Sequence, residues 1–158
     1  MVSSKCENGL LDNRGFTVAE VITAIGVFAI VMSIAVPNYV ALQPARRLNG
    51  AARDVLVQLM WARLKAVQEN NRFVVSLPNN HTLQILDDDN NNGAADAGET
   101  TRTINIQTDY PDVTLSKSGG DPTFFPRGTT GGSTTFTVTN SSGSKTITVS
   151  VTGNVKLN

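Results

Sequence analysis

The residues best suited to chemistry lie in one polar stretch, residues 87–99, which reads DDDNNNGAADAGE. With Asp88 at position 1, it fits the pattern D-x-[DN]-x-[DN]-G-x5-E, which spaces oxygen ligands around a calcium ion. We expect strands on both sides of it, so the alternative is a polar hairpin loop with Asp and Asn as turn residues. Both interpretations stay open. In the first, a structural Ca²⁺ is held by the side chains of Asp88, Asn90, Asn92, Asp96 and Glu99 and by the carbonyl of Ala94.

Glu20 is the second candidate, because it is the one carboxylate in the apolar run from Phe16 to Val36. This run has the length of about 20 residues that a helix needs to cross a bilayer. An ionisable side chain within such a segment costs about 2.5 kcal/mol or more unless it finds a partner. We therefore expect Glu20 to have a specific partner.

The sequence carries no recognisable catalytic constellation. His81 is the only histidine, it has no neighbour at metal-ligand spacing, and no Gly-x-Ser-x-Gly or phosphate-binding glycine loop is present. The carboxylates cluster in the polar loop, where no apolar pocket is evident that would tune their pKa values. We expect a chain that is not an enzyme, with His81 in a turn.

The residues around Glu20 carry a resemblance. The block from Gly15 to Val21, GFTVAEV, resembles the type III signal of the type IV pilin and pseudopilin superfamily. The resemblance implies that a prepilin peptidase cleaves between Gly15 and Phe16 and that Phe16 is N-methylated. It also implies that Glu20 neutralises the free amino group of Phe16 on a neighbouring subunit. The residues before the glutamate, usually leucine-isoleucine, are here valine-alanine, which keeps their apolar character.

Three other interpretations of the apolar run fit less well. A secretory signal has an apolar region of about 7 to 15 residues followed by a small-residue cleavage site, whereas this run is longer and Pro37 follows it. An ordinary signal anchor explains the length but neither Glu20 nor the Gly15-Phe16 pair. A buried helix of a soluble protein would need more chain downstream to surround it.

Composition and charge bound the class of protein. The 158 residues contain 13 basic and 13 acidic side chains, so no net charge points to nucleic acid. Lys5 and Arg14 precede the apolar run, which predicts a cytoplasmic N-terminus and a C-terminal domain outside the cytoplasm. The single cysteine, Cys6, lies in the leader, so we expect no disulfide in the exported part.

We predict one long helix over about residues 17–69, preceded by a cleaved leader, residues 1–15. Residues 16–37 form the transmembrane or filament-core segment, and Pro37 is expected to kink the helix because it lacks an N–H. In residues 38–70 apolar side chains recur every three or four positions, as is typical of an amphipathic helix that covers a sheet.

Residues 71–158 change to a period of two and are rich in valine, isoleucine, threonine and phenylalanine, which predicts an antiparallel β domain. A helix followed by hairpins gives an α+β fold. Trp61 and Met60 are expected in or beside its core, and residues 119–132 are expected to form a loop. The predicted strands are residues 72–77, 82–86, 101–107, 113–116, 134–139, 145–151 and 154–157.

The resemblance extends over nearly the whole chain. Four later segments are similar, in order, to the GspH/FimT family of pseudopilins and minor pilins: residues 61–67, the polar loop before Glu99, residues 124–128 and residues 151–155. The family implies the pilin fold, in which a long N-terminal helix packs on an antiparallel β-sheet domain.

The function implied is structural. We favour a minor pseudopilin of a type II secretion pseudopilus, a single-pass inner-membrane protein with a periplasmic C-terminal domain. The alternative is a minor type IV pilin in pilus biogenesis, adhesion, motility or DNA uptake, and an unrelated membrane-anchored binding module fits the Gly15-to-Glu20 block poorly. Expected partners are other pilins or pseudopilins, the prepilin peptidase and the inner-membrane assembly platform. With a single lysine in residues 153–158, we expect no nucleic-acid binding.

Overall fold

Helix α1, Val18–Glu69, is the longest element of the protein. The computed structural model describes residues 15–158, so the predicted leader up to Arg14, with Lys5 and Cys6, lies outside the described residues. The helix is continuous through Pro37, and the kink there stays a prediction. By its internal contacts the chain divides into two compact units, with the boundary in sequence between Ala41 and Leu42.

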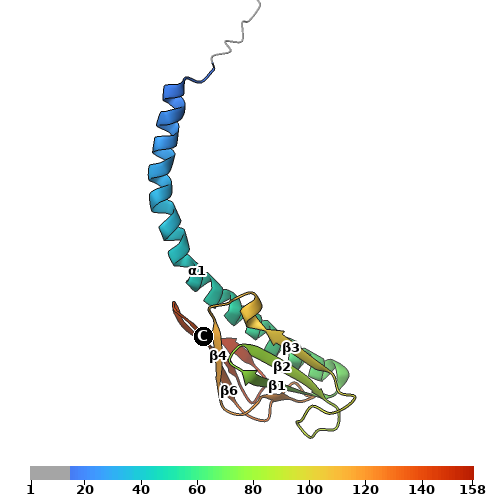
Figure 1. Ribbon diagram of the computed structural model, residues 1–158. Coiled ribbons are helices and arrows are strands. Elements are labelled where there is room, and N and C mark those ends of the chain that lie inside the picture. The colour runs from blue at the N-terminus through green and yellow to red at the C-terminus, as the bar shows by residue number, and fades with distance from the viewer. Residues whose placement is uncertain (1–14) are drawn as a thin grey trace, which may run out of the picture. The chain divides into compact units, whose positions relative to one another are not determined.

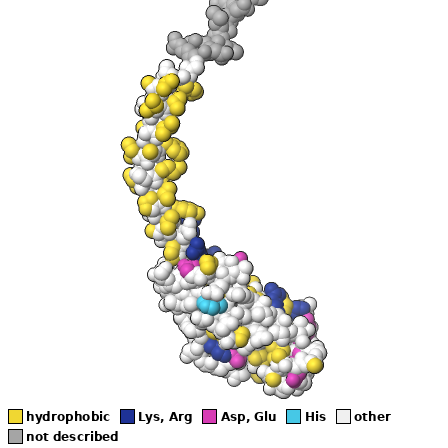
Figure 2. All heavy atoms as spheres, in the orientation of Figure 1, with side chains coloured by type: hydrophobic (Ala, Val, Ile, Leu, Met, Phe, Trp, Pro, Cys, Tyr) yellow, Lys and Arg dark blue, Asp and Glu magenta, His cyan; other side chains and the backbone are white. Residues whose placement is uncertain are grey.

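The described part of the N-terminal unit, residues 15–41, buries none of its side chains. It contains the one helical stretch among the described residues that is long and apolar enough to cross a membrane, judged by length and composition. Figure 2 shows hydrophobic side chains along this segment of α1. A helix that is apolar on all sides requires lipid or protein around it, so this unit fits a membrane anchor.

The C-terminal unit, Leu42–Asn158, contains two four-stranded antiparallel sheets (Figure 1). Their strand orders are β3-β2-β1-β5 and β4-β6-β7-β8. The strands are β1 (Arg72–Asn79), β2 (Thr82–Asp88), β3 (Thr101–Asn105), β4 (Thr114–Ser118), β5 (Thr123–Phe124), β6 (Thr134–Asn140), β7 (Gly143–Val149) and β8 (Val155–Leu157), with a 3-10 helix η1 (Ile106–Thr108) after β3.

All seven predicted strands are present, and the α+β fold with a long helix on antiparallel sheets is confirmed. The prediction missed β5, which has two residues and lies within the expected loop 119–132. It also extended β3 through η1. Segments this short contain too few residues to show a period.

The core forms where the second half of α1 packs against both sheets. Its buried face carries Leu48, Val55 and Leu59 together with four alanines, whose small side chains let the helix approach the strands closely. Phe124 and Phe136 are fully buried opposite it. The C-terminal unit therefore has a hydrophobic core shared by α1 and both sheets.

Trp61 and Met60 differ in position. Trp61 packs against the core, edge-on to Phe73 with ring centroids 6.3 Å apart, and Arg102 lies 4.6 Å from its ring centre. Met60 is 54% exposed and is not among the side chains that pack against the core, so the prediction that it lies in or beside the core was wrong. The reason is helical phase, because neighbouring residues on a helix point about 100° apart.

Candidate functional site

Glu20 lies in the first turn of α1 and closes a capping box with Thr17. Glu20 Oε2 accepts hydrogen bonds from the backbone N–H of Thr17 at 3.0 Å and from Thr17 Oγ1 at 3.1 Å. In return, Thr17 Oγ1 accepts from the backbone N–H of Glu20 at 3.2 Å. This arrangement satisfies backbone donors at a helix start that have no intrahelical acceptor.

The sequence analysis missed this local role of Glu20. The signal was present, since Thr17 and Glu20 have the Thr-x-x-Glu spacing of a capping box directly before an apolar run. A capping box gives the carboxylate a partner within its own chain. Gly15 and Phe16 lie just before the helix and are exposed, and the predicted cleavage between them stays a prediction.

The polar loop from Asp88 to Glu99 joins β2 to β3, so strands flank it as expected. Asp88 is 1% exposed, and its two carboxylate oxygens accept from the backbone N–H groups of Asn92 at 3.0 Å and Gly93 at 3.1 Å. Gly93 has a positive φ of 76°, the conformation that glycine adopts most readily. Asp88 therefore fixes the sharp turn at the position where the calcium pattern places its glycine.

Asp96 and Glu99 also accept hydrogen bonds from within the loop. Asp96 Oδ2 accepts from the side-chain amides of Asn90 at 2.8 Å and Asn92 at 2.5 Å, and these bonds lower the pKa of Asp96. Glu99 accepts from the backbone N–H groups of Asp96 at 3.0 Å and Asn90 at 3.4 Å. The five predicted side-chain ligands thus lie in one hydrogen-bonded loop.

The carboxylates of this loop are not gathered around one point. Within residues 15–158, no three His, Cys, Asp or Glu side chains lie close enough together to share a metal ion. The amide nitrogens of Asn90 and Asn92 face Asp96. Ala94 donates its N–H to Asn92 Oδ1 at 2.7 Å. Calcium binding would need both amides to turn their oxygens inward, and it stays a prediction.

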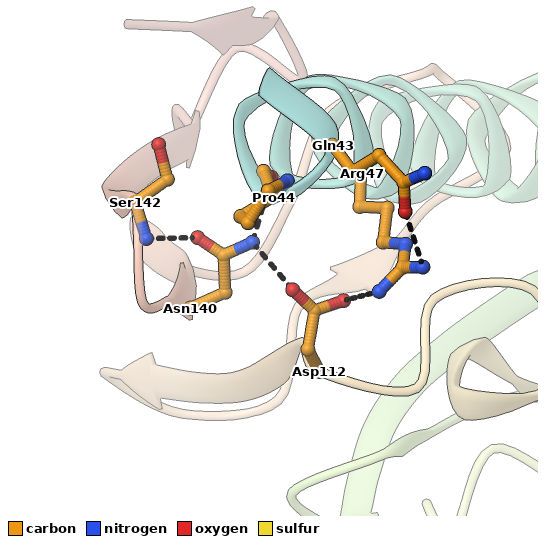
Figure 3. A network of polar contacts seen from close by, with 6 residues as sticks. All are labelled: Gln43, Pro44, Arg47, Asp112, Asn140 and Ser142. Atoms are coloured by element: carbon orange, nitrogen blue, oxygen red, sulfur yellow. Dashed lines mark hydrogen bonds and ion pairs between the residues drawn. The ribbon is translucent and has the colours of Figure 1, made fainter. Parts of the chain in front are cut away.

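A polar network ties α1 to the sheets where the C-terminal unit begins (Figure 3). Asn140, at the end of β6, donates from its side-chain amide to the carbonyl of Pro44 at 2.8 Å and to Asp112 Oδ2 at 3.1 Å. Arg47 pairs with Asp112 Oδ1 at 3.4 Å and donates to Gln43 at 3.1 Å. These contacts fix residues 43–47 of the helix against the β6–β7 turn.

Tyr110 makes a second attachment between the sheet domain and α1, at Gly50 and Asp54 of the helix. Its hydroxyl donates to Asp54 Oδ2 at 2.8 Å, and this bond raises the pKa of Tyr110 to about 12. The ring lies over Gly50, where an added Cβ would stand 2.7 Å from Tyr110 Cε1. Gly50 is therefore explained by packing.

Arg63 joins two of the segments that carried the family resemblance. Its Nε donates to the carbonyl of Gly128 at 3.0 Å. An added Cβ at Gly153 would lie 1.8 Å from that same carbonyl oxygen and 3.2 Å from Arg63 Nε. Gly128 and Gly153 have positive φ angles of 76° and 77°. Residues 124–128 and 151–155 therefore meet beside Arg63 at a junction, called the Arg63 junction below, that has no room for a side chain at Gly153.

Four apolar side chains of α1 form an outer stripe, defined as Val57 (56% exposed), Met60 (54%), Leu64 (63%) and Val67 (51%). They follow one another at intervals of three and four residues, on the side of the helix turned away from the sheets. The sequence analysis missed the stripe because it followed the apolar series of the buried face. The same three-and-four spacing, applied to residues 57–67, identifies it.

Comparison with known families decides the identity. A model of the family described as type II transport protein GspH matches residues 51–153. The chain belongs to the GspH family. Its members are structural pilin-like proteins, and the Arg63 junction and the outer stripe both lie within the matched region of this GspH-family chain.

Solved structures share the fold at low sequence identity. The type IV minor pilin FimU of Pseudomonas aeruginosa is similar with a TM-score of 0.58 and 18% identity, covering 72% of this chain and 90% of FimU. The minor pseudopilin EpsH of Vibrio cholerae is similar with a TM-score of 0.56 and 14% identity, covering 71% and 96%. A search of curated proteins gave no match. These likenesses show that the chain shares the fold of these pilin-like proteins.

Proposed function

We propose that this GspH-family chain is a minor pseudopilin, a structural and non-catalytic subunit of a type II secretion pseudopilus. The observation that carries the proposal is the family model, which is described as a type II transport protein and matches residues 51–153. The unburied apolar half of α1 supports it, because such a surface requires lipid before assembly and other subunits afterwards.

We further propose that the chain is made as an inner-membrane protein with its C-terminal unit in the periplasm. A prepilin peptidase would cleave it between Gly15 and Phe16 and methylate Phe16, which would remove the polar leader from the end of the apolar helix. Intact-mass measurement of the membrane-extracted protein from its native host tests this. An uncut leader, or a mature N-terminus after Ala35, would contradict it.

Assembly would bring the chain into contact with other pseudopilins and with an inner-membrane assembly platform. In the filament, Glu20 would neutralise the amino group of Phe16 on the adjacent subunit, exchanging its capping-box partner Thr17 for a cation. The exchange would offset the cost of a carboxylate among apolar helices.

The second candidate is a minor type IV pilin, because the likeness to FimU is as strong as the likeness to EpsH. Deleting the gene in the native host and restoring it on a plasmid separates the two. For a pseudopilin, exported proteins accumulate in the periplasm of the deletion strain and surface pili remain. Loss of pili with normal secretion would favour the minor pilin.

Two lesser properties are proposed for the C-terminal unit. The loop from Asp88 to Glu99 would bind one Ca²⁺ that fastens it, as the spacing of its oxygen groups suggests. The unit would not bind nucleic acid, since residues 153–158 offer Lys156 as their single cation. Salt-sensitive retention of DNA by the purified protein in a gel-shift experiment would contradict the second property.

A further inference from the structure

A pocket of about 670 Å³ lies beyond the end of α1 in the C-terminal unit. Three separate segments line it: residues 70–72, Asn91 of the polar loop, and residues 125–127 together with Thr129. We call it the amide pocket, because three of these residues are asparagines. Its volume is within the range of about 300–1,000 Å³ that is usual for small-molecule sites. We propose that the amide pocket binds a carboxylated sugar, a sugar ring that bears a carboxylate as in a uronic acid. This inference goes beyond the proposed function and does not depend on it.

The asparagines give the amide pocket both hydrogen-bond donors and acceptors. The side-chain nitrogen of Asn71 already donates to Asp87 and Asp89, at 2.6 Å each, which leaves its carbonyl oxygen as an acceptor. The hydroxyl of Thr129 can donate or accept. Sugar hydroxyls also donate and accept, so they match such a mixed lining. A bare anion only accepts, and it would leave the acceptor oxygens of the pocket unpaired.

Two arginines provide the place for the carboxylate. The guanidinium carbon of Arg72 lies 5.2 Å from the ring centre of Phe125, and its Nη1 donates to the carbonyl of Asn91 at 3.4 Å. These two contacts hold the planar guanidinium in position. Within residues 15–158, neither Arg72 nor Arg127 forms an ion pair, and no carboxylate lines the pocket. A guanidinium matches a carboxylate with two parallel hydrogen bonds.

The apolar part of the lining fits the C–H groups of a sugar ring. Phe125 and Pro126 supply it, and both are partly exposed. A small apolar surface beside a few convergent polar groups is typical of a ligand site. The carboxylate, the hydroxyls and the C–H groups of a carboxylated sugar therefore each have a matching group in this pocket.

The backbone of the pocket has an uncommon conformation at two places. Asn70 and Asn91, with φ of 53° and 63°, are the two non-glycine residues with positive φ within residues 15–158, and both line the pocket. Asn70 follows the last residue of α1, where this conformation ends a helix. Asn91 ends no helix. Residues held in such conformations cluster at ligand sites, which supports a binding role for this side of the polar loop.

The first test separates the carboxylate from the sugar ring. The full-length chain is purified in a detergent without a sugar headgroup and titrated with glucuronate, glucose or acetate in a calorimeter. We expect glucuronate to bind about tenfold or more tightly than either of the others, because only glucuronate uses both the arginines and the amides. Acetate binding as tight as that of glucuronate, glucose binding as tight, or no binding of glucuronate would each overturn the proposal.

Matched variants locate the site. Arg127→Gln removes a charge from the pocket, and Arg53→Gln removes one from an exposed position of α1 outside it. We expect Arg127→Gln to abolish the preference for glucuronate over glucose and Arg53→Gln to keep it. Asn70→Gly removes an amide while allowing the positive φ, and it should weaken the binding of both sugars. All three variants should melt near the wild-type temperature. Equal effects of the two arginine variants would show attraction by general surface charge and would overturn the proposal.

Competition by a polymer identifies the source of the sugar. Hyaluronate contains glucuronate units within a glycan chain, so it should displace glucuronate if the pocket takes its ligand from a polysaccharide. If glucuronate binds and hyaluronate does not displace it, the ligand is a free sugar acid. Either result keeps a carboxylated sugar as the ligand, and displacement of glucuronate by acetate at equal concentration would contradict it.

Discussion

The two halves of α1 have the same secondary structure but opposite burial. From Leu48 onward the helix closes a core with two sheets, whereas residues 18–41 expose every side chain. The difference shows that hydrophobicity has two uses in one continuous helix. In the second half it stabilises the fold of the chain, and in the first half it is available to a bilayer or to other subunits.

The largest expected difference comes from a pair of phenylalanines, one in β6 within the core that the second half of α1 closes and one in the first half of α1. Phe136 is fully buried and Phe28 is 63% exposed. Phe136→Ala should lower the free energy of unfolding by about 3–5 kcal/mol, because it removes core contacts and leaves a cavity. Phe28→Ala should change it by less than about 0.5 kcal/mol. Thermal melts of the full-length chain in detergent measure both, and similar losses would mean that the N-terminal half belongs to the folded core.

A second pair sharpens the comparison within the C-terminal unit. Gly153 and Gly93 have almost the same φ, 77° and 76°, but a Cβ at Gly93 would meet nothing within 4 Å. Both alanine substitutions incur the conformational cost of about 1 kcal/mol. Gly153→Ala should lose about 1–3 kcal/mol more, because its Cβ collides with the carbonyl of Gly128. Chemical denaturation of the two variants measures the difference in the free energy of unfolding. Equal losses would show that the backbone at the Arg63 junction shifts to accommodate the added methyl group without further cost.

Calcium should stabilise the loop in the C-terminal unit by a smaller amount. At ten times the dissociation constant, an ion that binds only the folded form adds about 1.4 kcal/mol. Melts with calcium, magnesium or chelator measure this, and magnesium should do less because it demands near-octahedral geometry. Glu99→Ala should abolish the shift. If calcium changes the melting temperature of neither protein, or raises that of the variant as much as that of the parent, the loop is a polar hairpin without a metal.

The smallest effect concerns the attachment of α1 through Tyr110. Because the folded-state pKa of about 12 lies above the ordinary value of 10, the hydrogen bond to Asp54 stabilises the fold fully below pH 10. That contribution is lost as the pH rises from 10 through 12. Tyr110→Phe should cost about 1 kcal/mol at neutral pH and should flatten this alkaline loss. Denaturation curves at several pH values check it, and an unchanged alkaline slope would contradict the assignment.

The sequence predicted the long elements well and the contacts between distant residues poorly. Helix α1 and most of the strands are long enough to show their periods, but β5 is not. The bond from Asn140 to Pro44 joins residues 96 positions apart, and nothing local at either residue indicates it. The capping box of Glu20 and the outer stripe could have been predicted, because their spacing is visible in the sequence. The apolar run drew attention away from the capping box, and the apolar series of the buried face drew attention away from the stripe.

Incorporation of Glu20 variants into filaments tests the central claim most directly. Glu20→Gln removes the charge and keeps a residue that closes a capping box with Thr17, whereas Thr17→Ala removes the box and keeps the charge. If the charge of Glu20 is used in the filament, Glu20→Gln should be largely excluded from isolated filaments, and Thr17→Ala should enter them near the wild-type level. Wild-type incorporation of Glu20→Gln, with exclusion of Thr17→Ala, would show that Glu20 serves the helix start alone and would contradict the account.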